Sequence, residues 1–163
     1  DTLPDFEEIG FGQSKLYRAE ALLTAKLARV IYQSFIRRET NKHLKPTILS
    51  PYSAQIGLIK ELLSDTPLYD KCLTIYQAQG REYPCVIISF VRKNEQGRIG
   101  FLDLPQLRPQ TYVACSRAMS KLIILISKQT FYERGYALFD HLIGRLENKI
   151  IDADPRWIEN DSI

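Results

Sequence analysis

Apolar residues recur along the first third of the chain at a spacing that fits one face of an α-helix. Between residues 16 and 36 they fall three or four positions apart with neither Gly nor Pro, and Ser14 is available as a cap. The spacing predicts a helix over 16–36. A second helix is predicted over 54–63, where the apolar face holds Ile56, Ile59, Leu62 and Leu63.

Short apolar runs stand between and after these helices. They predict strands over 46–50, 72–75, 86–91 and 122–127. The last two runs lack alternation of apolar and polar residues, which is typical of strands covered on both faces. A short helix is expected within 109–119 and another over 132–146, and the polar tail after residue 152 is expected to fray. This alternation predicts an α/β fold, a mostly parallel sheet with helices on both faces.

Length and composition favour one compact domain. The chain has 163 residues, of which 45% are hydrophobic, enough for a single core. We divide it into a lead-in over 1–13, the domain over 14–150 and a tail over 151–163. The net charge of +3 is mild, so any contact with nucleic acid must come from local patches rather than from a polycationic tail.

The cysteines and histidines argue against a disulfide framework and against a zinc site. Three widely spaced cysteines form no C-x-x-C pair, and the chain has only two histidines. Buried thiols in a reducing, intracellular compartment are expected, either the cytoplasm or the nucleus. No apolar run approaches the roughly 20 residues that cross a bilayer, so no membrane partner is predicted.

No self-contained catalytic site is visible in the sequence. Neither G-x-x-x-x-G-K-[ST] nor G-x-G-x-x-G occurs, so neither standard loop is present to hold the phosphates of a nucleotide. His43 lies in a basic loop and His141 in a predicted helix, and neither has an evident nucleophile beside it. Acidic residues do not cluster at a metal-binding spacing, so no metal site is predicted. A hydrolase complete in this chain is therefore not expected.

Several segments together give a more specific signal. They are LSPYSAQIGLIKEL (49–62), TIYQAQGREYPCVIISFVR (74–92), GRIGFL (97–102) and YVACSRAMSKLIILIS (112–127). In order and spacing they resemble the second motor domain of superfamily 1 helicases, and most of all the Upf-type branch related to the nonsense-mediated-decay helicase. The first resembles motif IV, the second motif V and the last motif VI. SKLYRAEA (14–21) resembles the start of that domain's first helix, so the resemblance covers nearly the whole chain.

The resemblance implies a RecA-like domain of the P-loop NTPase fold that lacks the Walker A loop. It implies the C-terminal motor half of an ATP-dependent RNA or DNA helicase. ATP and magnesium would be held mainly by an N-terminal RecA-like domain of the same protein, absent from this chain. The other implied partners are single-stranded RNA or DNA and regulatory proteins. The isolated chain is expected to be inactive, because an arginine finger without bound ATP has nothing to stabilise.

Two arginines are the catalytic candidates that the resemblance implies. Arg117, at the motif VI arginine, is the expected finger, and Arg18, in the SKLYRAEA segment, is the second. A guanidinium suits this role because its planar fork holds two phosphate oxygens and stays charged. The alternative for either arginine is an ordinary surface role, such as an ion pair with a carboxylate.

The Gln-Gly-Arg-Glu loop is the candidate nucleotide-binding segment. By resemblance it lies in the cleft, where Gly80 permits a tight turn and Glu82 accepts hydrogen bonds from ribose hydroxyls. Gln79 is the third candidate nucleotide-binding residue of this loop. Alternatively, Gly80 only shapes a turn and Glu82 is solvated.

The candidate nucleic-acid residues are Ser50, Pro51, Tyr52 and Thr74. By resemblance they line the single-strand groove, where backbone amides and hydroxyls hold phosphates without reading bases. Tyr52 either stacks on a base or is a buried aromatic. Five basic residues either supply the positive electrostatic potential of the groove or are merely solvated. They are Lys42, Lys45, Arg92, Lys93 and Arg98.

Three tyrosines depart from the family pattern. Tyr76 stands where motif V usually has Asp, Tyr112 where motif VI usually has Asn, and Tyr17 replaces an Asn. They favour an alternative function, a degenerate helicase-like domain that serves as a scaffold for protein or RNA. The retained arginines and the intact Gln-Gly-Arg-Glu loop oppose it. A third hypothesis is an unrelated α/β fold, which the order of strands in the sheet tests.

Overall fold

The fold is built around a four-stranded parallel sheet. The computed structural model describes residues 8–11, 14–103, 108–132, 139–140, 144–145 and 149–159. The sheet has the order β4-β3-β5-β6, and each of its pairings is parallel. Its strands are β3 (Thr47–Ser50), β4 (Cys72–Thr74), β5 (Tyr83–Ser89) and β6 (Ala118–Leu125). The predicted α/β class and the four predicted strands are confirmed.

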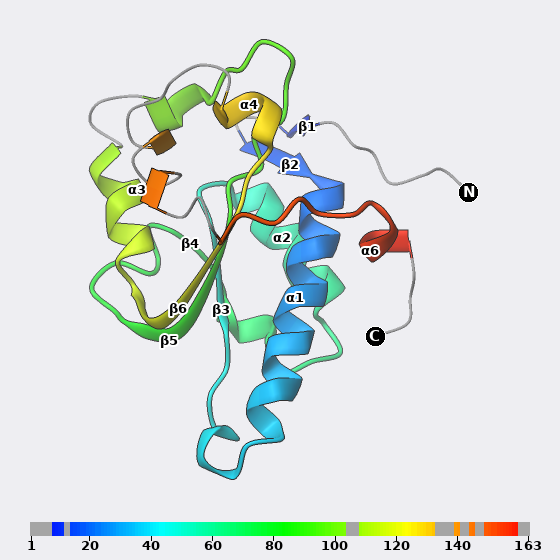
Figure 1. Cartoon of the computed structure of the whole chain (residues 1–163), viewed down its shortest axis with the longest axis vertical. Coiled ribbons are helices and arrows are strands. Elements are labelled where there is room, and N and C mark those ends of the chain that lie inside the picture. The colour runs from blue at the N-terminus through cyan, green and yellow to red at the C-terminus, as the bar shows by residue number, and fades with distance from the viewer. Residues whose placement is uncertain are drawn as a thin grey trace.

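Helices cover both faces of this sheet (Figure 1). On one face lie α1 (Arg18–Ile36) and α2 (Ser53–Leu62). On the other lie α3 (Arg108–Cys115) and α4 (Lys128–Tyr132). Short 3-10 turns fill three connections, at Glu39–Asn41, Tyr69–Lys71 and Gly100–Asp103. The short helix predicted within 109–119 is therefore confirmed as α3.

Strand β5 shows why its sequence has no polar alternation. Cys85 and Ile87 pack into the core beneath α1 and α2, while Val86 and Ile88 pack into the core on the opposite face. All four side chains are fully buried. A strand with a hydrophobic core on each side reads as a continuous apolar run, because successive side chains point to opposite faces.

The predicted start of the first helix was wrong. Leu16 and Tyr17 lie in β2 (Ser14–Tyr17), which pairs antiparallel with β1 (Glu8–Phe11) inside the predicted lead-in. Ser14 does not cap α1. Its Oγ instead accepts a hydrogen bond of 3.0 Å from the amide of Ala54 in the first turn of α2, 40 residues away. Ser14 thus satisfies an amide at the start of a helix distant in sequence.

Part of the tail after residue 152 is helical where fraying was expected. Residues 156–159 form the short helix α6 (Arg156–Glu159), which lies beside α1. Most of the helix predicted over 132–146 lies outside the described residues. Within the described ranges, no helix combines the length and the apolar character that a membrane crossing requires.

The segment after β5 makes two turns that restrict side-chain choice. Val91 has φ +71°, in the left-handed region that a β-branched residue rarely adopts. Gly100 has φ +62°, and a Cβ added there would lie 2.2 Å from Nη1 of the buried Arg92. The backbone at residue 100 therefore needs glycine both for its conformation and for the space that Arg92 occupies.

Substitution of this glycine should destabilise the fold. Gly100→Ala should lower the free energy of unfolding by about 1 to 3 kcal/mol, because it combines positive φ with displacement of Arg92. Gly57→Ala is the matched control, since Gly57 lies inside α2 with open space around its missing Cβ. That change should raise the free energy by about 0.5 to 1 kcal/mol. Urea unfolding of both variants measures the difference, and equal stability of the two would contradict this account.

Candidate nucleotide and nucleic-acid sites

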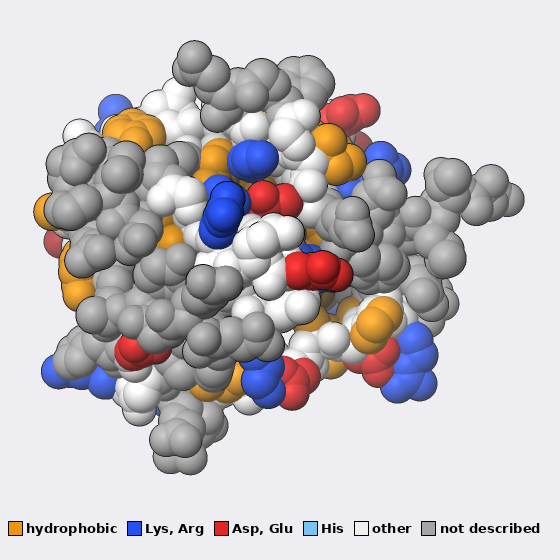
Figure 2. All heavy atoms as spheres, turned by 90° about the horizontal axis from the view of Figure 1, so that it is seen from above, with side chains coloured by type: hydrophobic (Ala, Val, Ile, Leu, Met, Phe, Trp, Pro, Cys, Tyr) orange, Lys and Arg blue, Asp and Glu red, His pale blue; other side chains and the backbone are white. Residues whose placement is uncertain are grey.

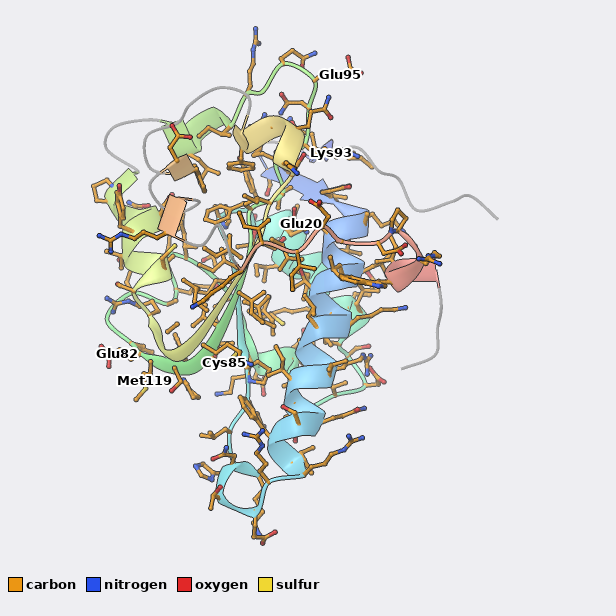
Figure 3. All side chains as sticks on the ribbon, viewed as in Figure 1. Glu20, Glu82, Cys85, Lys93, Glu95 and Met119 are labelled. Atoms are coloured by element: carbon orange, nitrogen blue, oxygen red, sulfur yellow. The ribbon has the colours of Figure 1, made fainter. Side chains whose placement is uncertain are left out.

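The candidate residues from the sequence fall at two opposite ends of the sheet. Because the strands are parallel, Ser50 and Thr74 end their strands at one edge, which we call the carboxyl edge. Glu82 and Arg117 come directly before β5 and β6, at the amino edge. Figure 3 shows Glu82 and Met119 at the lower left, beside the start of β5 and β6, and Lys93 and Glu95 near the top of the molecule. The two groups can therefore serve different ligands.

At the amino edge, the structure brings Arg117 against the Gln-Gly-Arg-Glu loop. Its Nε donates to the carbonyl of Val113 at 3.0 Å, Nη1 to the carbonyl of Arg81 at 3.3 Å and Nη2 to the hydroxyl of Ser116 at 3.2 Å. Its own carbonyl accepts from the amide of Tyr83 at 2.8 Å. These partners are all uncharged, and no ion pair of Arg117 occurs within the described ranges. The guanidinium charge is therefore held in place without being neutralised.

The loop itself carries the chain from the carboxyl edge to the amino edge. The carbonyl of Thr74 accepts from the amides of Gln77 and Ala78 at 3.0 and 3.2 Å, and the Ala78 side chain is fully buried. Gln79, Gly80 and Glu82 are exposed beyond this anchor. Gly80 has φ +75° with open space around its missing Cβ, so the conformation rather than crowding calls for glycine. A polar loop precedes the buried strand because the chain must return along the length of the strands, from the carboxyl edge to the amino edge, before β5 begins.

At the carboxyl edge, the predicted nucleic-acid residues are mostly covered. Ser50 and Tyr52 are 0% and 3% exposed, Pro51 is also buried, and the Ser50 hydroxyl accepts from the amide of Tyr52 at 3.2 Å. Thr74 is partly buried and bonds Gln77 with both its amide and its hydroxyl. Tyr52 presents no exposed ring face for stacking in this conformation. The role of these residues in binding nucleic acid stays a prediction.

Arg18 does not lie with Arg117. It is exposed at the first position of α1, and two residues further on Glu20 contacts the carboxyl end of β5. Arg117 contacts the amino end of the same strand through Tyr83. Seven residues of strand separate these ends by roughly 20 Å. The role predicted for Arg18 stays a prediction, and this chain alone does not bring the two arginines to one phosphate.

A buried carboxylate that the sequence did not single out joins several elements at the carboxyl edge. Glu20 is 5% exposed, and its Oε1 accepts from the Ser89 hydroxyl at 2.5 Å and from the Val91 amide at 2.8 Å. Gln55 donates to the same hydroxyl at 3.0 Å. Gln55 also bonds the amide of Tyr17 at 2.9 Å and its carbonyl at 3.2 Å. We call Glu20, Ser89 and Gln55 the buried polar cluster.

The buried polar cluster had a signal in the sequence. Glu20 is a charged residue between Ala19 and Ala21, on a helix face that is apolar apart from Thr24, and both neighbours are buried. A carboxylate at such a position needs partners from another element. Burial raises the pKa of Glu20 to about 7, although hydrogen bonds from Ser89 and from the backbone act in the opposite direction. Burial, with the charge of Glu20 beside it, raises the pKa of Tyr17 to about 12.

A second polar group surrounds Arg92, which the sequence assigned to a basic groove. Arg92 is 8% exposed and its Nε donates to Oε2 of Glu8 at 2.8 Å. Burial lowers the pKa of Arg92, but the neighbouring Tyr52 and Glu8 outweigh burial, and the net direction is upward. Lys93 Nζ lies 5.4 Å from the ring centre of Tyr17. Arg92 is therefore part of the folded structure rather than a free surface cation.

The remaining sequence candidates are more exposed. Tyr76 and Tyr112 are 44% and 47% exposed, so these two departures from the family pattern stand at the surface. Arg98 is exposed, Lys45 is partly buried, and Lys42 forms an ion pair with Glu39 at 2.6 Å. In the part of the chain that the structure describes, no three His, Cys, Asp or Glu residues group as metal ligands.

Comparison with known proteins gives a consistent result. A family described as an AAA domain matches residues 4–129. The DNA replication ATP-dependent helicase/nuclease DNA2 of Saccharomyces cerevisiae is 45% identical over 85 residues, 51% of this chain. The protein of the same description from Bos taurus is 34% identical over 139 residues, 80% of this chain. The DNA-binding protein SMUBP-2 of Mesocricetus auratus is 30% identical over 89 residues, 55% of this chain.

These matches cover small parts of much longer proteins. The aligned regions make up 5% of the yeast protein, 12% of the cattle protein and 9% of the hamster protein. The similarity therefore identifies one domain and does not transfer the activity of the whole relatives.

The buried Glu20 predicts a specific dependence of stability on pH. Its pKa is about 7 in the folded state against an ordinary 4.5, so between these values the folded state holds the proton more tightly. The free energy of unfolding should fall as pH rises through this window, by roughly 3 kcal/mol in all, and level off on either side. Glu20→Gln should flatten this slope in urea unfolding followed from about pH 5 to about pH 8.

Glu61→Gln is the matched control, because Glu61 is exposed on α2 and its loss removes the same charge. This variant should keep the slope of the unsubstituted protein. An unchanged slope in Glu20→Gln would show that another group titrates.

Proposed function

We propose a function from the family to which this chain belongs, the AAA domain that forms the C-terminal helicase domain of Upf-type superfamily 1 helicases. The chain is proposed to be one half of an ATP-dependent motor, and it acts on ATP that a partner domain holds. The observation that carries the proposal is the placement of Arg117. Its guanidinium is fixed by uncharged groups beside an exposed polar loop. Such a group is ready to meet an incoming anion without first breaking an ion pair.

The amino edge would supply only part of a nucleotide-binding site, and the N-terminal domain would supply the rest. ATP, when held by the N-terminal domain, supplies the phosphoryl group that is transferred to water. In this chain, Arg117 would bind phosphate oxygens, and Glu82 would accept hydrogen bonds from ribose hydroxyls. Gly80 would let the loop turn at the nucleotide, beside Gln79. Magnesium would be held mainly by the N-terminal domain, and the isolated chain would be inactive.

The carboxyl edge is proposed as this domain's part of the single-strand groove, with Ser50, Pro51, Tyr52 and Thr74 at its floor. Their covered side chains argue against base stacking, so contacts to phosphates are the proposed mode of binding. The relatives described above, a DNA replication helicase/nuclease and a DNA-binding protein, favour DNA over RNA as the strand. We therefore propose that the protein is intracellular and acts on DNA. Its nearest partner would be the N-terminal motor domain.

A scaffold function remains the second candidate, and the exposed tyrosines favour it. Tyr76 and Tyr112 stand where the family pattern has polar residues that organise the cleft. A domain that kept the fold but had lost the motor would still bind protein or RNA through such a surface. The two functions differ in whether Arg117 is needed for ATP hydrolysis.

Substitution of Arg117 in the protein that also contains the N-terminal motor domain separates these functions. Arg117→Ala should lower ATP hydrolysis stimulated by single-stranded DNA by about a thousandfold or more, because the phosphate charge in the transition state loses its cation. Steady-state ATPase rates of the two proteins make the test. ATPase activity that Arg117→Ala leaves unchanged would overturn the motor proposal and favour the scaffold.

Two further variants sharpen the comparison. Arg38→Ala removes an exposed arginine after α1 and should leave the rate unchanged. Arg18→Ala tests the second predicted finger. A loss as large as that in Arg117→Ala would show that hydrolysis needs both arginines although they lie at opposite ends of the sheet. A loss of strand affinity alone would assign Arg18 to the carboxyl edge.

A further inference from the structure

Three hydrogen-bond donors converge on one carboxylate oxygen near the end of β5. Oε2 of Glu8 accepts from Nε of Arg92 and from the backbone amide of Lys93, both at 2.8 Å, and from Nδ2 of Asn94 at 3.2 Å. The other oxygen, Oε1, lies 3.9 Å from Nζ of Lys15. The side chains of Glu8 and Arg92 are only 12% and 10% exposed. We call the three donors of Arg92, Lys93 and Asn94 the anion cradle.

The chemistry of this cradle fits a phosphate as well as a carboxylate. Its donors are a guanidinium, a backbone amide and a side-chain amide, the types that contact phosphate oxygens in protein complexes with nucleic acid. A phosphate oxygen and a carboxylate oxygen accept hydrogen bonds of similar length from such groups.

The cradle is fixed by groups other than Glu8. Arg92 fills the space left by the missing side chain of Gly100, and the buried Tyr52 lies beside the same position. The turn that aims the Lys93 amide begins at Val91, whose own amide is bonded to the buried Glu20. The donors therefore have a built position that does not depend on Glu8 alone.

The occupant, in contrast, comes from a separate element. Glu8 begins the described part of β1, and β1 pairs with β2 in a two-stranded sheet apart from the main one. Lys15 on β2 lies close enough to pair with the carboxylate if Glu8 turns away from Arg92. The position of Glu8 can change without breaking the four-stranded sheet.

The cradle lies at the carboxyl edge, where the single strand is proposed to bind. Tyr52 contacts Arg92 there, and Lys93 and Glu95 mark the same end of the molecule (Figure 3). Figure 2 views the molecule from this end and shows Lys and Arg side chains near the middle of the face, with acidic side chains beside them. A strand bound at this end would lie close to the cradle.

We propose that the anion cradle is a phosphate-binding site that Glu8 fills in the unbound chain and that a backbone phosphate of single-stranded nucleic acid takes over on binding. Glu8 acts as an internal competitor that lowers affinity for the strand. The proposal rests on the proposed function for the identity of the strand, while the cradle itself rests on the contacts above.

The test removes the competing charge and measures strand affinity. Glu8→Gln in the full-length protein should tighten binding of a labelled oligothymidylate by about tenfold. The slope of log affinity against log salt should steepen by about 0.7, the share of one additional phosphate. Glu39→Gln is the matched control, because it removes the same charge at an exposed site paired only with Lys42 in the described structure. It should change neither quantity.

A purely structural role for Glu8 gives a different result. The melting temperature of Glu8→Gln would fall while affinity and slope stayed at the values of Glu39→Gln, which would overturn the proposal. If Glu8→Gln does not fold, Glu8→Asp serves instead, since the shorter side chain keeps the charge but withdraws it from the cradle. Glu8→Asp should also tighten binding, and unchanged affinity would again overturn the proposal.

Inorganic pyrophosphate distinguishes the source of the phosphate. Stabilisation of Glu8→Gln by pyrophosphate without a gain for the oligothymidylate would assign the cradle to a free anion and overturn the strand proposal. The ATPase test is independent. A protein that loses hydrolysis in Arg117→Ala but gains no affinity in Glu8→Gln refutes this inference alone. A gain in Glu8→Gln with no effect of Arg117→Ala refutes the motor alone.

Discussion

The buried carboxylate of Glu20 is the interaction on which the arrangement of the carboxyl edge depends. A carboxylate that is 5% exposed is unfavourable unless hydrogen-bonded donors surround it, so α1 can dock only where Ser89 and the Val91 amide meet it. Gln55 extends the same requirement to α2 and β2. Apolar packing beneath these helices tolerates small shifts, but the hydrogen bonds do not. The buried polar cluster therefore fixes the position of α1 against β5, which the hydrophobic core alone leaves loose. It also fixes the turn after β5 that positions Arg92.

A parallel sheet separates the two tasks proposed for this domain by the length of its strands. Arg117 and Glu82 stand where strands begin, and Ser50 and Thr74 stand where strands end. The loop over 75–82 and helix α3 both run between these edges, so a displacement at one edge has a direct covalent path to the other. Each of these connections contains a tyrosine that departs from the family pattern, Tyr76 or Tyr112. These two segments are therefore among the connections through which the proposed motor could couple nucleotide to strand.

The sequence predicted what depends on local pattern and missed what depends on distant partners. The apolar run Val86–Ile88 predicted a strand covered on both faces, and the structure confirms this strand as part of β5. The helix predicted from residue 16 wrongly included Leu16, which lies in β2. The spacing of apolar residues gives no information on the pairing of β2 with β1. Ser14 was assigned to the nearest helix although its partner Ala54 lies 40 residues away. Glu8 gave no signal, since the donors around it come from residues more than 80 positions along the chain.

The strand order also sets the sequence of events in folding. In the order β4-β3-β5-β6 no two neighbours are joined by a hairpin, and the central pair aligns Thr47 with Val86. Long loops must close before the first ladder bonds of the sheet form, which makes such topologies slow to fold. Glu20 is synthesised 69 residues before its partner Ser89. The hydrogen bonds that join α1 to the end of β5 can therefore form only after β5 has been synthesised, although α2, which also packs on α1, is made earlier.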